Sequence, residues 1–364
     1  MIPVYQPCLN GNEKKYINQC LESGWISSKG EFIDRFETEF ATFLDVKFAT
    51  TVCNGTVALH LALMALKIGP GDEVIVPSFT YIASVNTIVQ TGATPVFVEV
   101  EGESLQLDIK DVEKKITEKT KAVMAVHLYG QASDVLSLRQ LCNDKGLYLV
   151  EDCAEAIGTS INGKMVGTFG DVSTFSFFGN KTITSGEGGM VVSNNKDIMD
   201  LCLRLKNQGV VKDRRYWHDI VAYNYRMTNL NAAIGVAQLE RVHEFIKRKR
   251  EIAKLYEENL TGLPLSVHKE KLGTVHTYWL TSIILSSSCS DQRDSLIEFL
   301  DLQGIESRPF FYPAHTLPMY ENITDEEFPL SNSLSSRGIN LPSWPGLNDE
   351  QVVFICKKIK EYFK

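Results

Sequence analysis

The stretch TFSFFGNKTITSGEGGM, residues 174–190, contains the features that decide the predicted fold. Thr174–Phe178 is rich in aromatic residues and predicts a buried strand, and Gly189–Ser193 predicts a second one. Lys181 stands between them, just before a glycine-rich turn. A single cation directly after a buried strand is unusual, because burial favours the neutral form of an amine.

Outward from this stretch, short apolar runs alternate with helical stretches. Further strands are predicted at Glu73–Pro77, Pro95–Val100, Ala122–His127 and Leu147–Glu151. Helices are predicted between them, at Val57–Leu66, Tyr81–Gln90 and Ile109–Thr117, and between residues 127 and 147. This alternation predicts an α/β fold with a mostly parallel sheet that is covered on both faces.

The pattern changes near residue 240. Leu239–Leu260 predicts one long charged helix, followed by a strand at His276–Leu285 and helices at Asp291–Gln303 and Asp349–Tyr362. We therefore expect a large α/β domain over residues 1–240 and a smaller α+β domain over residues 241–364, bridged by the long helix.

Composition excludes several classes of partner. The 364 residues carry 45 acidic and 37 basic side chains, a formal net charge of -8, which argues against nucleic acid or an anionic membrane as the main partner. Met1–Gly11 does not resemble a targeting leader, and no apolar run approaches the roughly 18–20 residues of a membrane span. Eight scattered cysteines without a CxxC pair predict reduced thiols in a cytoplasmic protein, with no metal centre.

Three segments carry candidate chemistry. In CNGTVALHLAL, residues 53–63, the N–H groups of Gly55 and Thr56 open a helix and suit an anion, although a plain capped turn has the same pattern. Asp152 follows a predicted strand, where it would pair with a buried cation or cap the next segment. Lys181 is either a solvated loop residue or a buried nucleophile. Together, an amine, a carboxylate and an anion site match the needs of pyridoxal 5'-phosphate.

Five stretches carry a family resemblance: residues 54–56 (NGT), 77–84 (PSFTYIAS), 151–156 (EDCAEA), 174–189 (TFSFFGNKTITSGEGG) and 223–235 (YNYRMTNLNAAIG). In this order they resemble the DegT/DnrJ/EryC1/StrS family of sugar aminotransferases. The resemblance implies a fold-type I aminotransferase, with a mostly parallel seven-stranded sheet and a smaller C-terminal α+β domain. It also implies homodimers with shared active sites, or tetramers made from them.

Three stretches narrow the expected substrate: residues 174–184, 216–229 and 311–320 (TFSFFGNKTIT, YWHDIVAYNYRMTN and FYPAHTLPMY). They most resemble family members that move the amino group of L-glutamate to C4 of a nucleotide sugar, GDP-4-keto-6-deoxymannose, to give GDP-perosamine. The activity implied for this chain is therefore one step of surface-glycan (O-antigen, lipopolysaccharide) biosynthesis.

The resemblance also implies a role for each matching residue. Lys181 would form the Schiff base with the cofactor and move protons, and Asp152 would pair with the ring nitrogen. The remaining cofactor contacts are Glu155 at the ring hydroxyl, Tyr81 on the ring face, Gly55, Thr56 and Ser176 at the phosphate, and Asn224 at the phosphate of the neighbouring subunit. The substrate contacts are Arg226, Tyr312 and His315.

Other functions stay open at this point. A relative in the same family would use another acceptor, such as a UDP- or dTDP-linked keto-sugar or a small phosphorylated ketone. Sugar dehydratases that resemble this fold carry a histidine in place of the Schiff-base lysine, so Lys181 argues against that activity. A regulator or scaffold without chemistry is disfavoured by the complete catalytic set and by the lack of a recognisable DNA-binding extension.

Overall fold

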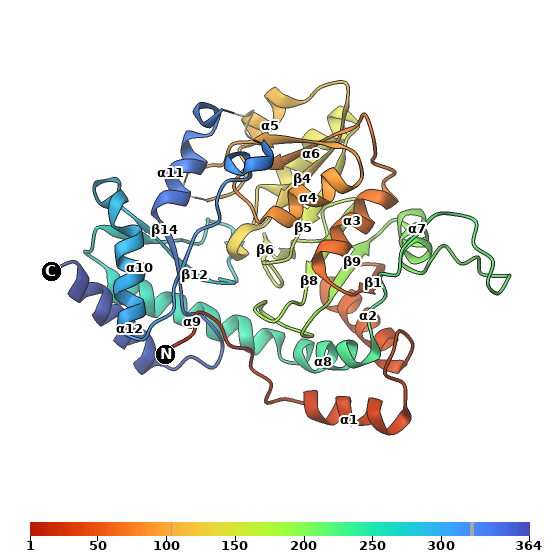
Figure 1. The fold of residues 1–364 in the computed structure, drawn as a ribbon, viewed down its shortest axis with the longest axis horizontal. Coiled ribbons are helices and arrows are strands. Elements are labelled where there is room, and N and C mark those ends of the chain that lie inside the picture. Colours follow the sequence, from red (N-terminus) through yellow and green to blue (C-terminus); the bar gives the residue numbers. More distant parts are fainter. Residues whose placement is uncertain (103, 321–323) are drawn as a thin grey trace.

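The computed structural model describes residues 1–102, 104–320 and 324–364, and its centre is a seven-stranded sheet (Figure 1). Its strands are β1 (Phe48–Val52), β2 (Glu73–Pro77), β3 (Thr94–Val98), β4 (Thr120–Val126), β5 (Tyr148–Asp152), β8 (Val172–Ser176) and β9 (Gly189–Ser193). They lie in the order β1-β9-β8-β5-β4-β2-β3, and β9 alone among these seven runs against the others. The predicted α/β class and mostly parallel sheet are confirmed.

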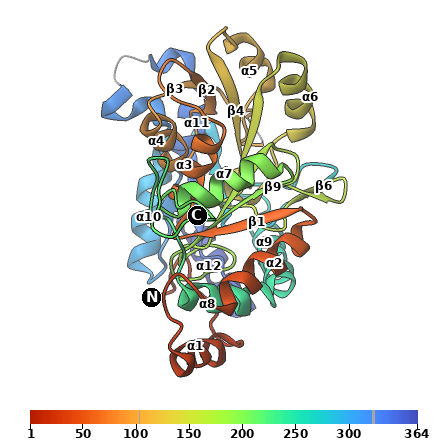
Figure 2. The same cartoon turned by 90° about the vertical axis from the view of Figure 1, so that its right-hand side faces the viewer.

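Both faces of this sheet are covered, as the alternation of side chains along β4 shows. Ala122 and Met124 belong to one hydrophobic core, and Val123 and Ala125 belong to the other. The first core is shared with α3 (Gly55–Ala65), α4 (Ile82–Gln90) and α7 (Lys196–Lys206). The second is shared with α1 (Glu13–Ser23), α2 (Glu31–Leu44), α5 (Ile109–Lys115), α6 (Val135–Lys145) and α8 (Asn229–Leu239). In the turned view of Figure 2, α5 and α6 lie to one side of β4, and α3 and α4 lie to the other.

A smaller antiparallel sheet follows later in the chain. Its strands are β10 (Leu265–Val267), β12 (Thr281–Leu285), β14 (Gly338–Leu341) and β13 (Arg308–Pro309), in that spatial order. It shares a third core with α9 (Val242–Leu260), α10 (Arg293–Leu302) and α12 (Asp349–Tyr362). This part of the chain also contains α11 (Pro329–Arg337) and β11 (Thr274–Val275). β11 pairs with β6 (Ser160–Ile161), and β6 pairs with β7 (Lys164–Met165), two short strands that lie between β5 and β8 in the sequence.

The long helix α9 joins the two parts. Its first turns contribute Val242 and Phe245 to a core of the large sheet, and its later turns contribute Ile252 and Tyr256 to the core of the small sheet. The division at residues 240 and 241 stays a prediction.

Two predicted elements differ from the structure. The helix expected from Leu239 to Leu260 is present as α9 but begins only at Val242, because Arg241 leaves helical geometry (φ -115°, ψ 8°) and Leu239 ends α8. The strand expected from His276 begins only at Thr281, because Tyr278 adopts a left-handed φ of 48°. Strand β1, with the sequence FATTV, has no counterpart among the predicted strands, and two threonines interrupt its apolar residues.

The cysteines are all free thiols, and five of the eight are buried. Buried thiols of this kind pack as small apolar side chains. Within the part of the chain that the structure describes, no helix is both long and apolar enough to cross a membrane.

A buried carboxylate anchors the segment that leads into β8. Glu151 lies in β5 and is fully buried, yet it accepts five hydrogen bonds. The donors are the backbone N–H groups of Gly167, Phe169 and Gly170, the hydroxyl of Ser173 and Nε2 of His127. Burial alone would raise the pKa of Glu151, but the bonds from His127 and the backbone outweigh it and lower the pKa.

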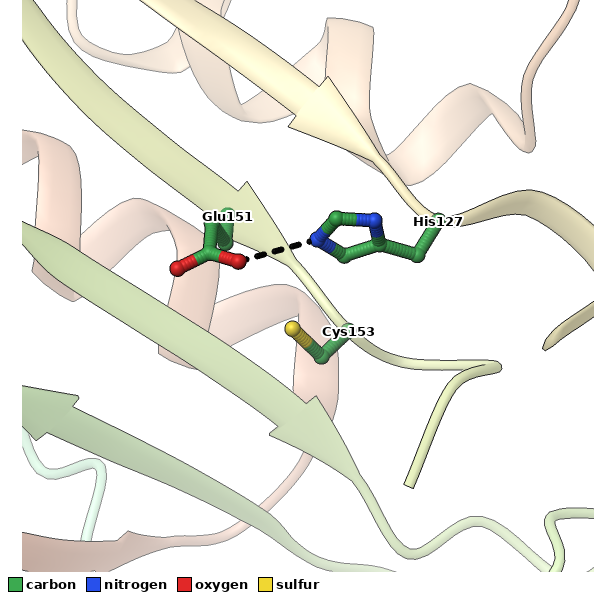
Figure 3. A group of neighbouring side chains, drawn as sticks. All are labelled: His127, Glu151 and Cys153. Atoms are coloured by element: carbon green, nitrogen blue, oxygen red, sulfur yellow. Dashed lines mark hydrogen bonds and ion pairs between the residues drawn. The ribbon is translucent and has the colours of Figure 1, made fainter. Parts of the chain in front are cut away.

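His127, Glu151 and Cys153 form the cluster drawn in Figure 3, with donor atoms within 4.8 Å of one another. Nδ1 of His127 accepts the N–H of Ser133 at 3.1 Å, so Nε2 carries the proton that is donated to Glu151 at 3.0 Å. Hydrogen bonds thus already engage both ring nitrogens and both carboxylate oxygens. The cluster is a packing and hydrogen-bonding device, with His127 the hydrogen-bonded core histidine expected from its place at a strand end.

Glu151→Gln is expected to lower the free energy of unfolding by about 3–5 kcal/mol, because an amide cannot accept from all five buried donors. The loss in free energy of unfolding has its full size above the ordinary glutamate pKa of 4.5. It becomes smaller as the pH falls through the lowered pKa of Glu151, because the wild-type carboxylate is then protonated as well. Urea unfolding at several pH values measures it, with Glu118→Gln at an exposed position as the control. Equal stability of the two variants would contradict the anchoring role.

Candidate active site

A cavity of about 900 Å³ opens between the large sheet and the small one. It lies at the carboxyl ends of β5 and β8, where ligands of parallel α/β sheets collect. Arg308, Pro309 and Asn340 of the small sheet contribute to its lining. Seven of the predicted site residues line it: Gly55, Thr56, Tyr81, Asp152, Glu155, Ser176 and Lys181.

Lys181 follows β8 and is largely buried, with 13% of its side chain exposed. Its Nζ lies 3.6 Å from Oε1 of Glu155 and 4.0 Å from the centre of the Trp279 ring. Burial lowers the pKa of Lys181, while the charges of Glu155 and Asp152 oppose that shift. The structure therefore places a desolvated amine, rather than a solvated loop cation, at the wall of the cavity.

Glu155 is the buried counterpart of this amine. Its Oε2 accepts the backbone N–H of Tyr129 at 2.8 Å. Burial raises the pKa of Glu155 to about 7, although Lys181 acts to lower it. Burial thus favours the neutral forms of both members of the pair, the amine and the carboxylic acid.

Asp152 ends β5 and is nearly buried. Its Oδ2 accepts the hydroxyl of Ser84 at 2.7 Å, and its Oδ1 accepts the N–H of Ala154 at 3.1 Å. These two donors fix the orientation of a carboxylate that lines the cavity, as an ion pair with a protonated ring nitrogen requires.

The N-terminus of α3 also lines the cavity. Asn54 caps this helix, its Oδ1 accepting the N–H of Val57 at 2.9 Å. A Cβ at Gly55 would lie 2.7 Å from Cβ of Ser176, so glycine is required for the close approach of this turn to β8. Helix N-termini attract phosphate groups. Together with Thr56 and the Ser176 hydroxyl, this wall fits the phosphate of pyridoxal phosphate, and the cavity as a whole fits the cofactor.

Four predicted residues do not line the cavity of their own chain: Asn224, Arg226, Tyr312 and His315. Asn224 is exposed, and its Oδ1 accepts from Nε of Arg226. Tyr312 is 59% exposed. His315 is buried, with Nδ1 2.6 Å from Oγ of Ser78. The substrate roles of Arg226, Tyr312 and His315 therefore gain no support from this chain.

The structure also reveals site residues that the sequence analysis missed. Ser84 follows Tyr81 by three positions and so shares its side of a helical turn, a spacing that could have identified it. Trp279 lies under Nζ of Lys181, and His60 lines the cavity one turn after Thr56. The contact between Trp279 and Lys181 depends on tertiary packing, so no local sequence pattern could have predicted it.

Comparisons with known proteins agree with this site. The DegT/DnrJ/EryC1/StrS aminotransferase family model matches residues 7–360. A Vibrio cholerae protein named GDP-perosamine synthase is 71% identical over 364 residues, covering 100% of this chain and 99% of the relative. A protein of the same name from Escherichia coli O157:H7 is 56% identical over 362 residues, covering 100% of this chain and 98% of the relative.

A solved structure extends the agreement to the fold. The putative sugar aminotransferase Spr1654 from Streptococcus pneumoniae, in its PLP form, superposes with a TM-score of 0.94 at 28% identity, covering 99% of this chain and 98% of that one. The α/β architecture is accordingly that of the fold-type I pyridoxal-phosphate aminotransferases, as expected from the motifs. The chain belongs to the DegT/DnrJ/EryC1/StrS aminotransferase family.

Proposed function

We propose that this protein transfers the amino group of L-glutamate to C4 of GDP-4-keto-6-deoxymannose, giving GDP-perosamine and 2-oxoglutarate for O-antigen synthesis. One observation carries the proposal. The amine, the carboxylate and the helix N-terminus that pyridoxal phosphate needs meet in one cavity. They do so in a chain that is 71% identical, from end to end, to a protein named GDP-perosamine synthase.

Each cavity residue has a proposed part in holding the cofactor. Pyridoxal phosphate, when bound, supplies an aldehyde that reacts with amines and a ring that accepts an electron pair. We assign the amine of Lys181 to the aldehyde and Asp152 to the ring nitrogen. The other assigned contacts are Glu155 at the ring hydroxyl, Tyr81 on the ring face, and Gly55, Thr56 and Ser176 at the phosphate.

Lys181 also has a proposed part in proton transfer. Burial lowers the pKa of the Lys181 amine and so favours its neutral form, which can take a proton from the amino-bearing carbon of the substrate. Glu155, 3.6 Å away, keeps the resulting ammonium from standing uncompensated in a buried place. The same amine then returns the proton, as each half of a transamination requires.

We further propose that the active unit is a homodimer with Asn224 at the phosphate of the neighbouring subunit. Tyr223 and Tyr225 line the cavity of their own chain. Asn224 lies between them in an extended segment bridged to Asn207, so its side chain points the other way. Nε of Arg226 donates to the side-chain Oδ1 of Asn224 at 2.8 Å, which leaves the side-chain NH2 group of Asn224 to donate to a phosphate from outside the chain.

The substrate proposal predicts a clear preference among acceptors. With L-glutamate as donor, kcat/KM for GDP-4-keto-6-deoxymannose should exceed that for UDP- and dTDP-linked 4-keto-sugars and for dihydroxyacetone phosphate. The nucleotide acts as an anchor whose binding energy orients C4 at the site of amine transfer, and effects of this kind reach about 100-fold for small misplacements. Product masses and rates measure the preference. Preference for another acceptor would refute the substrate and leave the transaminase activity intact.

The assembly proposal predicts complementation between two inactive chains. Mixing Lys181→Ala with Asn224→Ala subunits should restore activity, because in one of the two sites of a mixed dimer both defects coincide and the other site is intact. Each mixed dimer should have about half of the wild-type activity, since one of its two sites works. An equal mixture of the two chains should have about a quarter of the wild-type activity overall, because about half of its dimers are mixed. Self-mixing of each variant is the control. If subunits exchange and Asn224→Ala is disabling, yet no activity returns, Asn224 serves its own chain.

A further inference from the structure

Two side chains hold the backbone around Lys181 by donating hydrogen bonds to two consecutive carbonyl groups. The carbonyl of Asn180 accepts a hydrogen bond from Nε1 of Trp279 at 2.7 Å. The next carbonyl, that of Lys181 itself, accepts from the hydroxyl of Tyr5. Both donors come from far along the chain, with sequence separations of 99 and 176 residues.

Tyr5 reaches Lys181 because the N-terminal segment is tied to the part of the chain that carries the small sheet. Ile2 pairs with Ile305 in a parallel bridge, and the carbonyl of Val4 accepts the N–H of Ser343 at 3.1 Å. The N–H of Val4 donates to Glu306 at 2.9 Å. Figure 1 shows this segment starting beside α9 and α12 and running along α9 toward α1. The segment therefore crosses from the small sheet to the Lys181 loop.

The ring of Tyr5 is supported from the other side by a buried lysine. Nζ of Lys249, in α9, lies 5.2 Å from the centre of the ring and donates to the carbonyl of Ser343 at 2.8 Å. Burial raises the pKa of the Tyr5 phenol above its ordinary value, with a smaller contribution from Cys8. The hydroxyl consequently keeps its proton and can donate to the Lys181 carbonyl.

The segment that carries Lys181 needs such support. Gly179, Gly186 and Gly188 interrupt the loop between β8 and β9, and glycine restricts the backbone least. A lysine side chain adds large rotamer freedom of its own. Holding two successive carbonyls limits where the Lys181 amine can go, and the Trp279 ring that donates to Asn180 also lies 4.0 Å below that amine.

We propose that Tyr5 and Trp279 are positioning residues, which clamp the backbone at Asn180 and Lys181 and so hold the Lys181 amine against Glu155. The inference rests on the proposed role of Lys181 and adds the means by which that role is achieved. The N-terminal segment thereby acts on the chemistry of the site through the backbone.

Tyr5→Phe tests the clamp, since it removes the hydroxyl and keeps the ring. Tyr256→Phe is the matched control, because Tyr256 is fully buried and its hydroxyl donates to the carbonyl of Pro342 at 3.0 Å, away from Lys181. Each variant loses one hydrogen bond between a phenol and a backbone carbonyl, so urea unfolding should show similar losses of stability.

Two readouts separate positioning from stability. In the holoenzyme, Tyr5→Phe should lower kcat about three- to tenfold with KM changed by less than about twofold, as expected for a transition-state effect the size of one hydrogen bond. In the cofactor-free full-length chain, the rate at which Lys181 captures added pyridoxal phosphate, followed by absorbance, should fall by a similar factor. Tyr256→Phe should change neither quantity.

Trp279→Phe tests the second clamp independently and should lower the capture rate in the same direction, even if Tyr5→Phe fails to fold. Capture rates and kcat values for Tyr5→Phe and Trp279→Phe that match those of Tyr256→Phe would overturn the inference alone. A wild-type chain that captures no cofactor at Lys181 would overturn the proposed function as well, so the two failures are distinguishable.

Discussion

The contact between the Lys181 amine and the Glu155 carboxylate, two buried groups 3.6 Å apart, is the constraint on which the rest of the site depends. Burial disfavours the ammonium form of a lysine unless an opposite charge or hydrogen bonds compensate it. Glu155 supplies the opposite charge for Lys181, and the neutral form of the amine is the reactive one. The large sheet brings the two together, because β5 and β8 are neighbouring parallel strands that end at the same edge.

Two successive acidic residues of β5, Glu151 and Asp152, have different roles. Glu151 points into one core, where backbone N–H groups and His127 saturate its carboxylate. Asp152, one residue on, points the other way and lines the cavity with Ser84 and Ala154 holding it. Because successive side chains of a strand point to opposite faces, Glu151 is a structural anchor while Asp152 is a candidate cofactor ligand. The anchor fixes the segment that enters β8, and β8 in turn delivers Lys181.

Most strands of the large sheet could be predicted from the sequence, because they are short apolar runs. The candidate reactive residues Asp152 and Lys181 could be predicted as well, because they lie at or just after the ends of such runs. The exceptions have physical causes. Strand β1 is rich in threonine and gains its place by pairing with β9. The break at Arg241 and the left-handed Tyr278 depend on tertiary packing. Tyr5 and Trp279 meet the Lys181 loop across separations of 176 and 99 residues, for which no local pattern exists. His315 lies in the interior beside Ser78, and its substrate role stays a prediction.

A low lysine pKa alone does not identify the reactive amine. Burial lowers the pKa of Lys249 to about 7 as well, but Lys249 donates to a backbone carbonyl and does not line the cavity. Borohydride reduction of the purified enzyme, followed by peptide mass spectrometry, therefore tests the central claim most directly. The account predicts the reduced cofactor on Lys181 and its loss in Lys181→Ala. Attachment at Lys249 or at any other lysine, or no covalent cofactor at all, would contradict it.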